Sequence, residues 1–298
     1  MSEYILVTDS SADLSGEMAD AIQVPVLPLR FTIQGQTYRN YADNREMDPA
    51  LFYDMLRAGE LATTAALNPN DFVEELEPYL KDGKDILILA FSSGLSNTYN
   101  AARLAAEELH EKYPDRKIYA VDTLCASMGQ GLLVWLAAQK RDAGATIEEV
   151  RDWAEENKLH LCHQFTVDDL HFLKRGGRIS ATTAVVGSML QIKPVLHVDD
   201  EGHLINIGKA RGRHASLKAL VDKMEKKAHL KGQKYYDSFS FREPTAFLIG
   251  NEGNGLTKEI SDQAGQYLKI PMEGKVESLN ASIAAALLMY EAHRQRNL

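Results

Sequence analysis

The chain has 298 residues, of which 45% are hydrophobic and 25% charged, the balance of an ordinary globular protein. That length is enough for two domains that each bury a core of their own. The formal net charge of −9 argues against coating nucleic acid or an anionic membrane. The two cysteines, Cys125 and Cys162, form no CxxC pair, and no histidine pair has metal-ligand spacing. We therefore expect reduced structural thiols and neither a metal nor a cofactor.

The composition of the amino terminus predicts a strand and not a signal peptide. Residues 1–9 have no basic start and no long apolar stretch. No apolar run in the chain approaches the ~20 residues that a membrane-spanning helix requires. We expect a soluble, cytoplasmic protein without a membrane span.

Strands and helices are predicted to alternate through the first half of the chain. Strands are expected at 4–8, 24–33, 86–91 and 117–121. Helices are expected at 49–58, 71–80, 99–109, 126–143 and 147–158, with a loop at 63–69. This alternation is typical of the α/β class with a doubly wound, mainly parallel sheet.

The pattern changes after residue 160. A strand is predicted at 162–167, and a hairpin joins residues 195–198 to 204–208 through an Asp-Asp-Glu-Gly turn. A helix is expected at 215–228. We therefore predict an N-terminal α/β domain of residues 1–160 and a second, smaller α/β domain of residues 161–298 that contains the hairpin.

The most informative local feature is a serine-rich turn at residues 92–98. It follows a continuous apolar run typical of a buried parallel strand, and a helical pattern begins directly after it. Ligands of open α/β sheets bind at the carboxyl ends of the strands. Small hydroxyl side chains and free backbone N–H groups at a helix start suit a carboxylate or a phosphate. The turn contains no His, Cys, Lys or carboxylate, so the sequence predicts a site that holds an anion and does not cleave it.

Six segments resemble, in order, the DegV family of fatty-acid-binding proteins. They are VTDSSADL at 7–14, SSGLSNTY at 92–99, VDT at 121–123, LKRGGRIS at 173–180, IKPVL at 192–196 and KARGR at 209–213. The resemblance covers about residues 1–228. It implies a carrier of one long-chain fatty acid, not an enzyme. Such a carrier presents the carboxyl end to a separate fatty-acid kinase and carries the resulting acyl-phosphate.

By position, the resemblance assigns the fatty-acid carboxylate to Thr63, Thr64 and Ser93, with Ser92 and Ser96 as supports. The chain departs from the family here, because TTAALNP stands where Thr-Ser-Gln-Pro-Ser is usual. The sequence still has a hydroxyl group at Thr64. Capping of the following helix is the alternative role for Ser92 and Ser93.

Charged residues add two further hypotheses. Arg178 either complements the bound anion or pairs with a surface acid. A basic group consists of Lys209, Arg211 and Arg213. It either docks a partner or the acyl-phosphate, or it forms a solvated charged turn. Asp9 and Asp122 each follow a strand, so we expect them to accept turn N–H groups and not to bind the ligand.

The last quarter of the chain resembles a different family. Residues 245–256, 268–272 and 276–286 are similar to the C-terminal half of SpoU-type RNA 2′-O-ribose methyltransferases, and the resemblance covers about residues 229–298. It implies S-adenosylmethionine contacts at Gly250, Ile270, Leu279 and Asn280. The Asn-x-Gly…Arg segment expected before Thr245, with its catalytic arginine, is absent from the sequence. We therefore expect the tail to complete the core of the second domain.

Three functions are consistent with these patterns. A non-enzymatic fatty-acid carrier agrees best with the serine-rich turn. An RNA 2′-O-ribose methyltransferase that uses S-adenosylmethionine is the alternative, and it agrees poorly with an acidic chain that has half of that fold. A small-molecule-binding protein whose ligand is not a lipid is the third.

Overall fold

The chain folds into two compact units. The structure, a computed structural model, describes residues 3–179, 192–225, 232–236, 239–243, 245–249, 256–257, 260, 264, 266–269 and 281–296. The first unit comprises Met1–Gln164, Leu170–Val186 and Leu196–Asn206, and the second comprises Phe165–Asp169, Gly187–Val195 and Ile207–Leu298. The predicted division at residue 160 stays a prediction.

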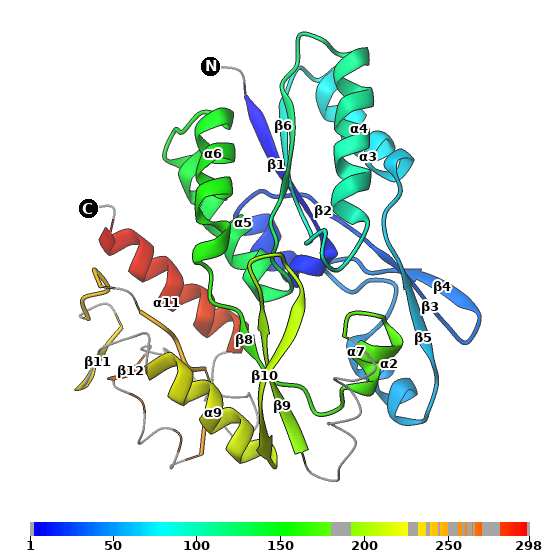
Figure 1. Cartoon of the computed structure of the whole chain (residues 1–298). Helices are drawn as coiled ribbons and strands as arrows, with labels where there is room; N and C mark the ends of the chain where they lie inside the picture. The colour runs from blue at the N-terminus through cyan, green and yellow to red at the C-terminus, as the bar shows by residue number, and fades with distance from the viewer. Residues whose placement is uncertain are drawn as a thin grey trace. The chain divides into compact units, whose positions relative to one another are not determined.

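A four-stranded parallel sheet forms the centre of the first unit (Figure 1). Its order is β2 (Val26–Leu27), β1 (Tyr4–Asp9), β6 (Asp85–Ala90) and β7 (Ile118–Asp122), with Thr8 opposite Leu89 and Ala90 opposite Asp122. All six residues of β6 are buried, which explains why residues 86–90 are continuously apolar and do not alternate. The predicted α/β class with a mainly parallel sheet is confirmed.

Helices cover both faces of this sheet. Helices α3 (Pro69–Lys81) and α4 (Thr98–Lys112) pack on one face, where Phe72, Leu76 and Leu109 join Ile86 and Ile88 in the core. Helices α5 (Met128–Asp142) and α6 (Ile147–Asn157) lie on the opposite side (Figure 1). This unit also contains two short 3-10 helices, η1 (Ser10–Ala12) and η2 (Lys158–His160), and helix α1 (Gly16–Ala21).

An antiparallel sheet stands beside the parallel one and corrects a prediction. Its order is β4 (Gln36–Arg39), β3 (Arg30–Ile33) and β5 (Ala62–Ala65). Helix α2 (Pro49–Arg57) lies between β4 and β5 in the chain. The predicted loop at 63–69 is therefore wrong in its first part, because backbone pairing with β3 makes residues 62–65 a strand. The cap of the next helix is Asn68, since Asn68 and Asp71 form a capping box.

The predicted hairpin is present in the second half of the chain. Strands β9 (Ile192–Val198) and β10 (Leu204–Arg211) are neighbours in a sheet of order β10-β9-β8, with β8 at Gln164–Phe165. The hairpin closes where the amide of Asp199 donates to the carbonyl of His203 over 3.0 Å. Helix α7 (His171–Arg175) precedes β9 in the chain.

The second unit contains helix α9 (Arg213–Glu225), the parallel pair β11 (Gly232–Tyr235) and β12 (Gln266–Lys269), and helix α11 (Ala281–Arg296). Its core includes Phe239, Phe241, Leu288 and Ala292. Gln295 fixes the last helix to the segment before it. Its Oε1 accepts the Phe241 amide over 2.9 Å, and its Nε2 donates to the Phe239 carbonyl over 2.7 Å.

Replacing Gln295 with methionine is expected to destabilise the second unit by about 1–3 kcal/mol, because it leaves a buried backbone donor and acceptor without partners. Methionine has a similar length and helix propensity, so the lost hydrogen bonds dominate. Urea unfolding of the full chain measures the change. Gln36→Met, at an exposed position of β4, serves as the control and is expected to leave stability unchanged.

Candidate functional site

The serine-rich turn joins the carboxyl end of β6 to the start of α4, where open α/β sheets bind their ligands. Ser93 is exposed at this turn. Its hydroxyl makes no hydrogen bond within the part of the chain that the structure describes. Ser93 therefore presents a donor to solvent at the position where the sequence predicts an anion.

The backbone amides of the turn are largely used inside the protein. The Ser93 amide donates to Asp122 Oδ1 over 3.1 Å, and the Gly94 amide donates to Ser92 Oγ over 3.1 Å. The amides of Leu95 and Ser96 both donate to the Ser92 carbonyl over 3.1 Å. The expectation of free N–H groups is therefore wrong for residues 93–96. An anion here depends mainly on hydroxyl groups.

Ser92 and Ser96 both make internal hydrogen bonds. Ser92 is fully buried, and its Oγ donates to the Gly202 carbonyl over 2.9 Å. Ser96 Oγ accepts the Thr98 amide two residues further along over 3.2 Å, a local turn contact just before α4. The predicted ligand contacts of these two serines stay predictions, and Ser93 is the exposed hydroxyl of the turn.

Arg178 lies against the serine-rich turn. Its Nε donates to the Leu95 carbonyl over 3.1 Å, and a terminal guanidinium nitrogen donates to the Gly176 carbonyl. Within the described residues it pairs with no carboxylate. The surface ion pair offered as one role for Arg178 is thus not observed there, and its positive charge stands beside the turn.

Asp9 and Asp122 accept turn amides, as predicted. Asp9 is buried and accepts the amides of Ser11 over 3.0 Å and Phe91 over 2.8 Å. Burial raises the pKa of the Asp9 carboxyl, and these hydrogen bonds partly oppose the rise. Asp122 Oδ1 accepts the amides of Ser93 over 3.1 Å and Leu124 over 3.2 Å. Both carboxylates therefore shape the strand ends.

Thr63 and Thr64 are both exposed, and they lie on opposite faces of β5 because successive strand residues alternate. Thr63 is opposite Thr32, whose hydroxyl is 2.8 Å from that of Thr37. Thr64 is opposite Phe31, whose ring contacts Tyr38 and the α2 residue Phe52. The two threonines are thus placed in different surroundings, one polar and one aromatic.

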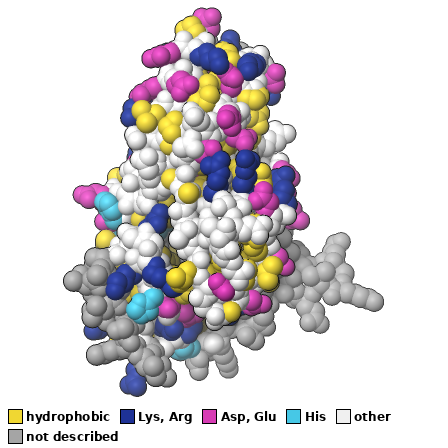
Figure 2. Space-filling view, turned by 90° about the vertical axis from the view of Figure 1, so that its right-hand side faces the viewer, with side chains coloured by type: hydrophobic (Ala, Val, Ile, Leu, Met, Phe, Trp, Pro, Cys, Tyr) yellow, Lys and Arg dark blue, Asp and Glu magenta, His cyan; other side chains and the backbone are white. Residues whose placement is uncertain are grey.

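The basic group lies around the end of β10. Lys209 and Arg211 are exposed on this strand, and Arg213 begins α9. Arg213 Nη1 is 3.8 Å from Asp168 Oδ1, a long ion pair at the surface that contributes little to stability. On the face shown in Figure 2, basic and acidic side chains are interspersed over the described residues.

The Cys125 thiol is not activated as a nucleophile. The Cys125 carbonyl accepts the Ser92 amide over 3.2 Å. Burial raises the pKa of the Cys125 thiol to about 12, so the group stays protonated and is a poor nucleophile. Among the described residues, no group of three or more His, Cys, Asp or Glu side chains is arranged to hold a metal ion.

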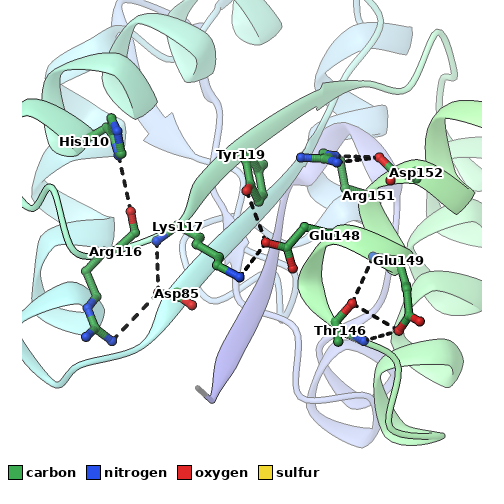
Figure 3. A network of polar contacts seen from close by, with 10 residues as sticks. All are labelled: Asp85, His110, Arg116, Lys117, Tyr119, Thr146, Glu148, Glu149, Arg151 and Asp152. Atoms are coloured by element: carbon green, nitrogen blue, oxygen red, sulfur yellow. Dashed lines mark hydrogen bonds and ion pairs between the residues drawn. The ribbon is translucent and has the colours of Figure 1, made fainter. Parts of the chain in front are cut away.

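A surface pocket of about 400 Å³ lies at the amino end of β7, away from the carboxyl end that carries the turn. Figure 3 shows the polar network around it. Lys117 Nζ is 2.6 Å from Glu148 Oε1, and Arg116 Nη1 is 3.8 Å from Asp85. Both cations at this pocket are already paired, so it is a weaker candidate for an anion than the serine-rich turn.

One contact of the turn has no signal in the local sequence. Gly202 at the tip of the hairpin touches Ser92, although 110 residues separate them. The sequence identifies Gly202 as a turn residue and gives no indication of which segment the hairpin turn contacts.

The four positions of the methyltransferase alternative, Gly250, Ile270, Leu279 and Asn280, lie outside the described residues. No helix in the described ranges combines the length and apolar character needed to cross a bilayer.

The parallel sheet and the hydroxyl-bearing turn at its carboxyl edge define an α/β protein with exposed hydroxyl groups where open sheets bind their ligands. Over residues 4–237 the chain matches the family described as uncharacterised proteins of the DegV family. A DegV domain-containing protein of Clostridium perfringens is 49% identical over 227 residues, 76% of this chain and 78% of that protein. One of Streptococcus pyogenes is 39% identical over 223 residues, 75% and 78% of the two chains. The chain belongs to the DegV family.

Solved structures show the same fold. A DegV family protein of Thermus thermophilus, described for its fatty-acid binding, is 32% identical, with a TM-score of 0.66 over 78% of this chain and 81% of that one. A Thermotoga maritima protein described as revealing fatty-acid binding function is 27% identical, with a TM-score of 0.65 over 79% and 81%. These relatives lend no support to the methyltransferase resemblance of residues 229–298.

Proposed function

We propose that the chain binds one long-chain fatty acid and holds its carboxylate with side-chain hydroxyls at the mouth of an apolar tunnel. The observation that carries this proposal is the exposed Ser93 hydroxyl, which has no partner among the described residues and follows a buried parallel strand. Membership of the DegV family supports it, since two relatives above 25% identity are described as fatty-acid binders. Arg178 would complement the negative charge of the carboxylate.

The proposed role is that of a cytoplasmic carrier and not of an enzyme. Around the turn, Asp122 Oδ1 accepts two backbone amides, and the Cys125 thiol stays protonated and is a poor nucleophile. A separate fatty-acid kinase would phosphorylate the presented carboxyl end. Lys209, Arg211 and Arg213 would then dock the kinase or hold the acyl-phosphate, whose added negative charge they complement.

Mass spectrometry of the full chain tests the proposal. Native spectra are expected to show one ligand per chain, and spectra after denaturation are expected to identify it as a long-chain fatty acid. Protein that retains no fatty acid, even after incubation with one, would contradict the proposal. Calorimetry with S-adenosylmethionine forms a separate arm, in which a saturable signal that Asn280→Ala removes would favour the methyltransferase instead.

Thr63→Ala and Thr64→Ala are expected to differ in their effect on fatty-acid binding. A carboxylate suits the polar face of β5, so Thr63→Ala is expected to weaken binding about tenfold, the loss of one hydrogen bond to a charged group. Thr64 shares its face with Phe31 and α2, so Thr64→Ala is expected to change binding less than about twofold. A fluorescent fatty acid displaced by oleate measures both. Equal losses in the two variants would contradict this assignment.

A further inference from the structure

The tip of the β9–β10 hairpin, residues 199–203, lies directly against the serine-rich turn. Ser92 Oγ donates to the Gly202 carbonyl over 2.9 Å and accepts the Gly94 amide over 3.1 Å. Ser92 is fully buried. One buried hydroxyl therefore ties the backbone of the turn to the backbone of the hairpin.

Two glycines make this close approach possible. A Cβ atom on Gly94 would lie 2.8 Å from the Glu201 carbonyl oxygen, and one on Gly202 would lie 2.1 Å from Ser92 Oγ. Gly202 also has a φ of +77°, a conformation that favours glycine. Neither position has space for a larger residue unless the turn or the hairpin moves.

The hairpin tip is fixed by its own hydrogen bonds. Asp199 Oδ1 accepts the amides of Glu201 over 3.0 Å and His203 over 2.8 Å. The Gly202 amide donates to the Asp199 carbonyl over 3.0 Å. An aspartate that accepts amides further along its turn fixes the local backbone, so the tip meets Ser92 with a defined shape.

Two more hydrogen bonds, involving Arg178 and Asp122, hold the serine-rich turn in place. Arg178 Nε donates to the Leu95 carbonyl over 3.1 Å, and Asp122 Oδ1 accepts the Ser93 amide over 3.1 Å. Ser93 is therefore exposed between neighbours that are fixed on both sides. The position of its Cα and Cβ atoms follows from the contacts of Ser92 and Leu95.

We infer that the hairpin tip is a positioning element for the proposed head-group site. Gly202 and Ser92 set the place of Ser93 through the backbone of the turn. A hydrogen-bond donor is effective only within a narrow range of distance and angle, so a shifted turn binds the carboxylate less well. The ligand in this inference rests on the proposed function; the contact between turn and hairpin does not.

Gly202→Ala is the first test, with Gly212→Ala as its matched control. Both glycines have positive φ, +77° and +85°, but a Cβ on Gly212 meets nothing within 4 Å. The two variants therefore share backbone strain, and Gly202→Ala adds the clash with Ser92. We expect Gly202→Ala to weaken the displacement of a fluorescent fatty acid by oleate about tenfold and Gly212→Ala to change it less than about twofold.

A double variant tests the contact without any ligand. Ser92→Ala removes the atom that a Cβ at position 202 would strike, so it is expected to recover part of the stability lost in Gly202→Ala. The unfolding free energies of the two single variants and the double variant should then be non-additive. Additive effects would overturn the contact. Hydrogen exchange of the Gly94 amide gives a second readout, since Ser92→Ala removes its acceptor and is expected to speed exchange.

The outcomes distinguish the positioning role of the hairpin tip from the proposed fatty-acid binding. A wild-type chain that binds fatty acid, combined with equal affinities for Gly202→Ala and Gly212→Ala, overturns the positioning role and leaves the proposed function intact. A wild-type chain that binds no fatty acid overturns the function, while the double variant still reports on the contact. If Gly202→Ala does not fold, Ser92→Ala alone decides: unchanged fatty-acid affinity overturns the positioning role.

Discussion

Fatty-acid binding is expected to weaken roughly 10- to 150-fold when Ser93 is replaced by alanine, a loss on the order of 1.5–3 kcal/mol for one hydrogen bond to a charged group. The Ser93 hydroxyl is exposed and makes no hydrogen bond among the described residues, so its removal breaks no internal contact. The amides of residues 93–96 are already engaged and do not replace it. Displacement of a fluorescent fatty acid by oleate measures the change.

Two further variants make this result specific. Ser93→Thr keeps a hydroxyl at the same position and is expected to bind within a few-fold of the wild type. Ser240→Ala removes an exposed hydroxyl of the second unit and is expected to have no effect. The urea-unfolding midpoints of all three variants should equal that of the wild type. An unchanged affinity in Ser93→Ala would remove Ser93 from the proposed site.

The parallel sheet is predictable from the sequence because its signal is local. Residues 86–90 are apolar at every position since both faces of β6 are covered by helices, and such a run has few other interpretations. The strand ends are predictable for a related reason. Asp9 and Asp122 follow their strands directly, and a carboxylate there accepts the amides of the turn that it begins.

The small sheet and the amide pattern depend on contacts that the local sequence does not contain. Residues 62–65 have no alternation of apolar and polar side chains, and they become a strand only because β3 pairs with them. The Ser93 amide is taken by Asp122, 29 residues further along the chain. Composition identifies the turn as a hydroxyl-rich helix start, but which of its donors stay free is decided by distant segments.

This dependence also explains why the two neighbouring serines differ. The sequence offers Ser92 and Ser93 the same two roles, capping or ligand contact. In the fold the hairpin tip covers Ser92, and Ser93 remains exposed. Because neighbouring side chains in a turn point in different directions, one internal contact is enough to bury Ser92 and leave Ser93 exposed.

Acidification is expected to destabilise the chain between about pH 6.5 and pH 4 because His163 is held neutral in the folded state. Burial, and then the charge of His197, lowers the pKa of His163 from 6.5 to about 4. Within the described residues its buried Nε2 has no hydrogen-bond partner. The unfolded chain binds a proton near pH 6.5 and the folded chain does not, so the stabilisation is full above that pH. It is lost as the pH falls toward 4, by at most about 3 kcal/mol.

The ring of His163 packs closely on α5, where a Cβ on Gly129 would lie 1.6 Å from Nε2. The site therefore has no space for a water or a counter-ion beside a charged imidazole at this contact. His163→Phe keeps a ring of similar size and is expected to remove most of the pH dependence in this range. His160→Gln, at an exposed position, is expected to retain it. Urea unfolding at pH 7, 6, 5 and 4.5 measures the difference, and equal slopes in the wild type and His163→Phe would show that another group causes the loss.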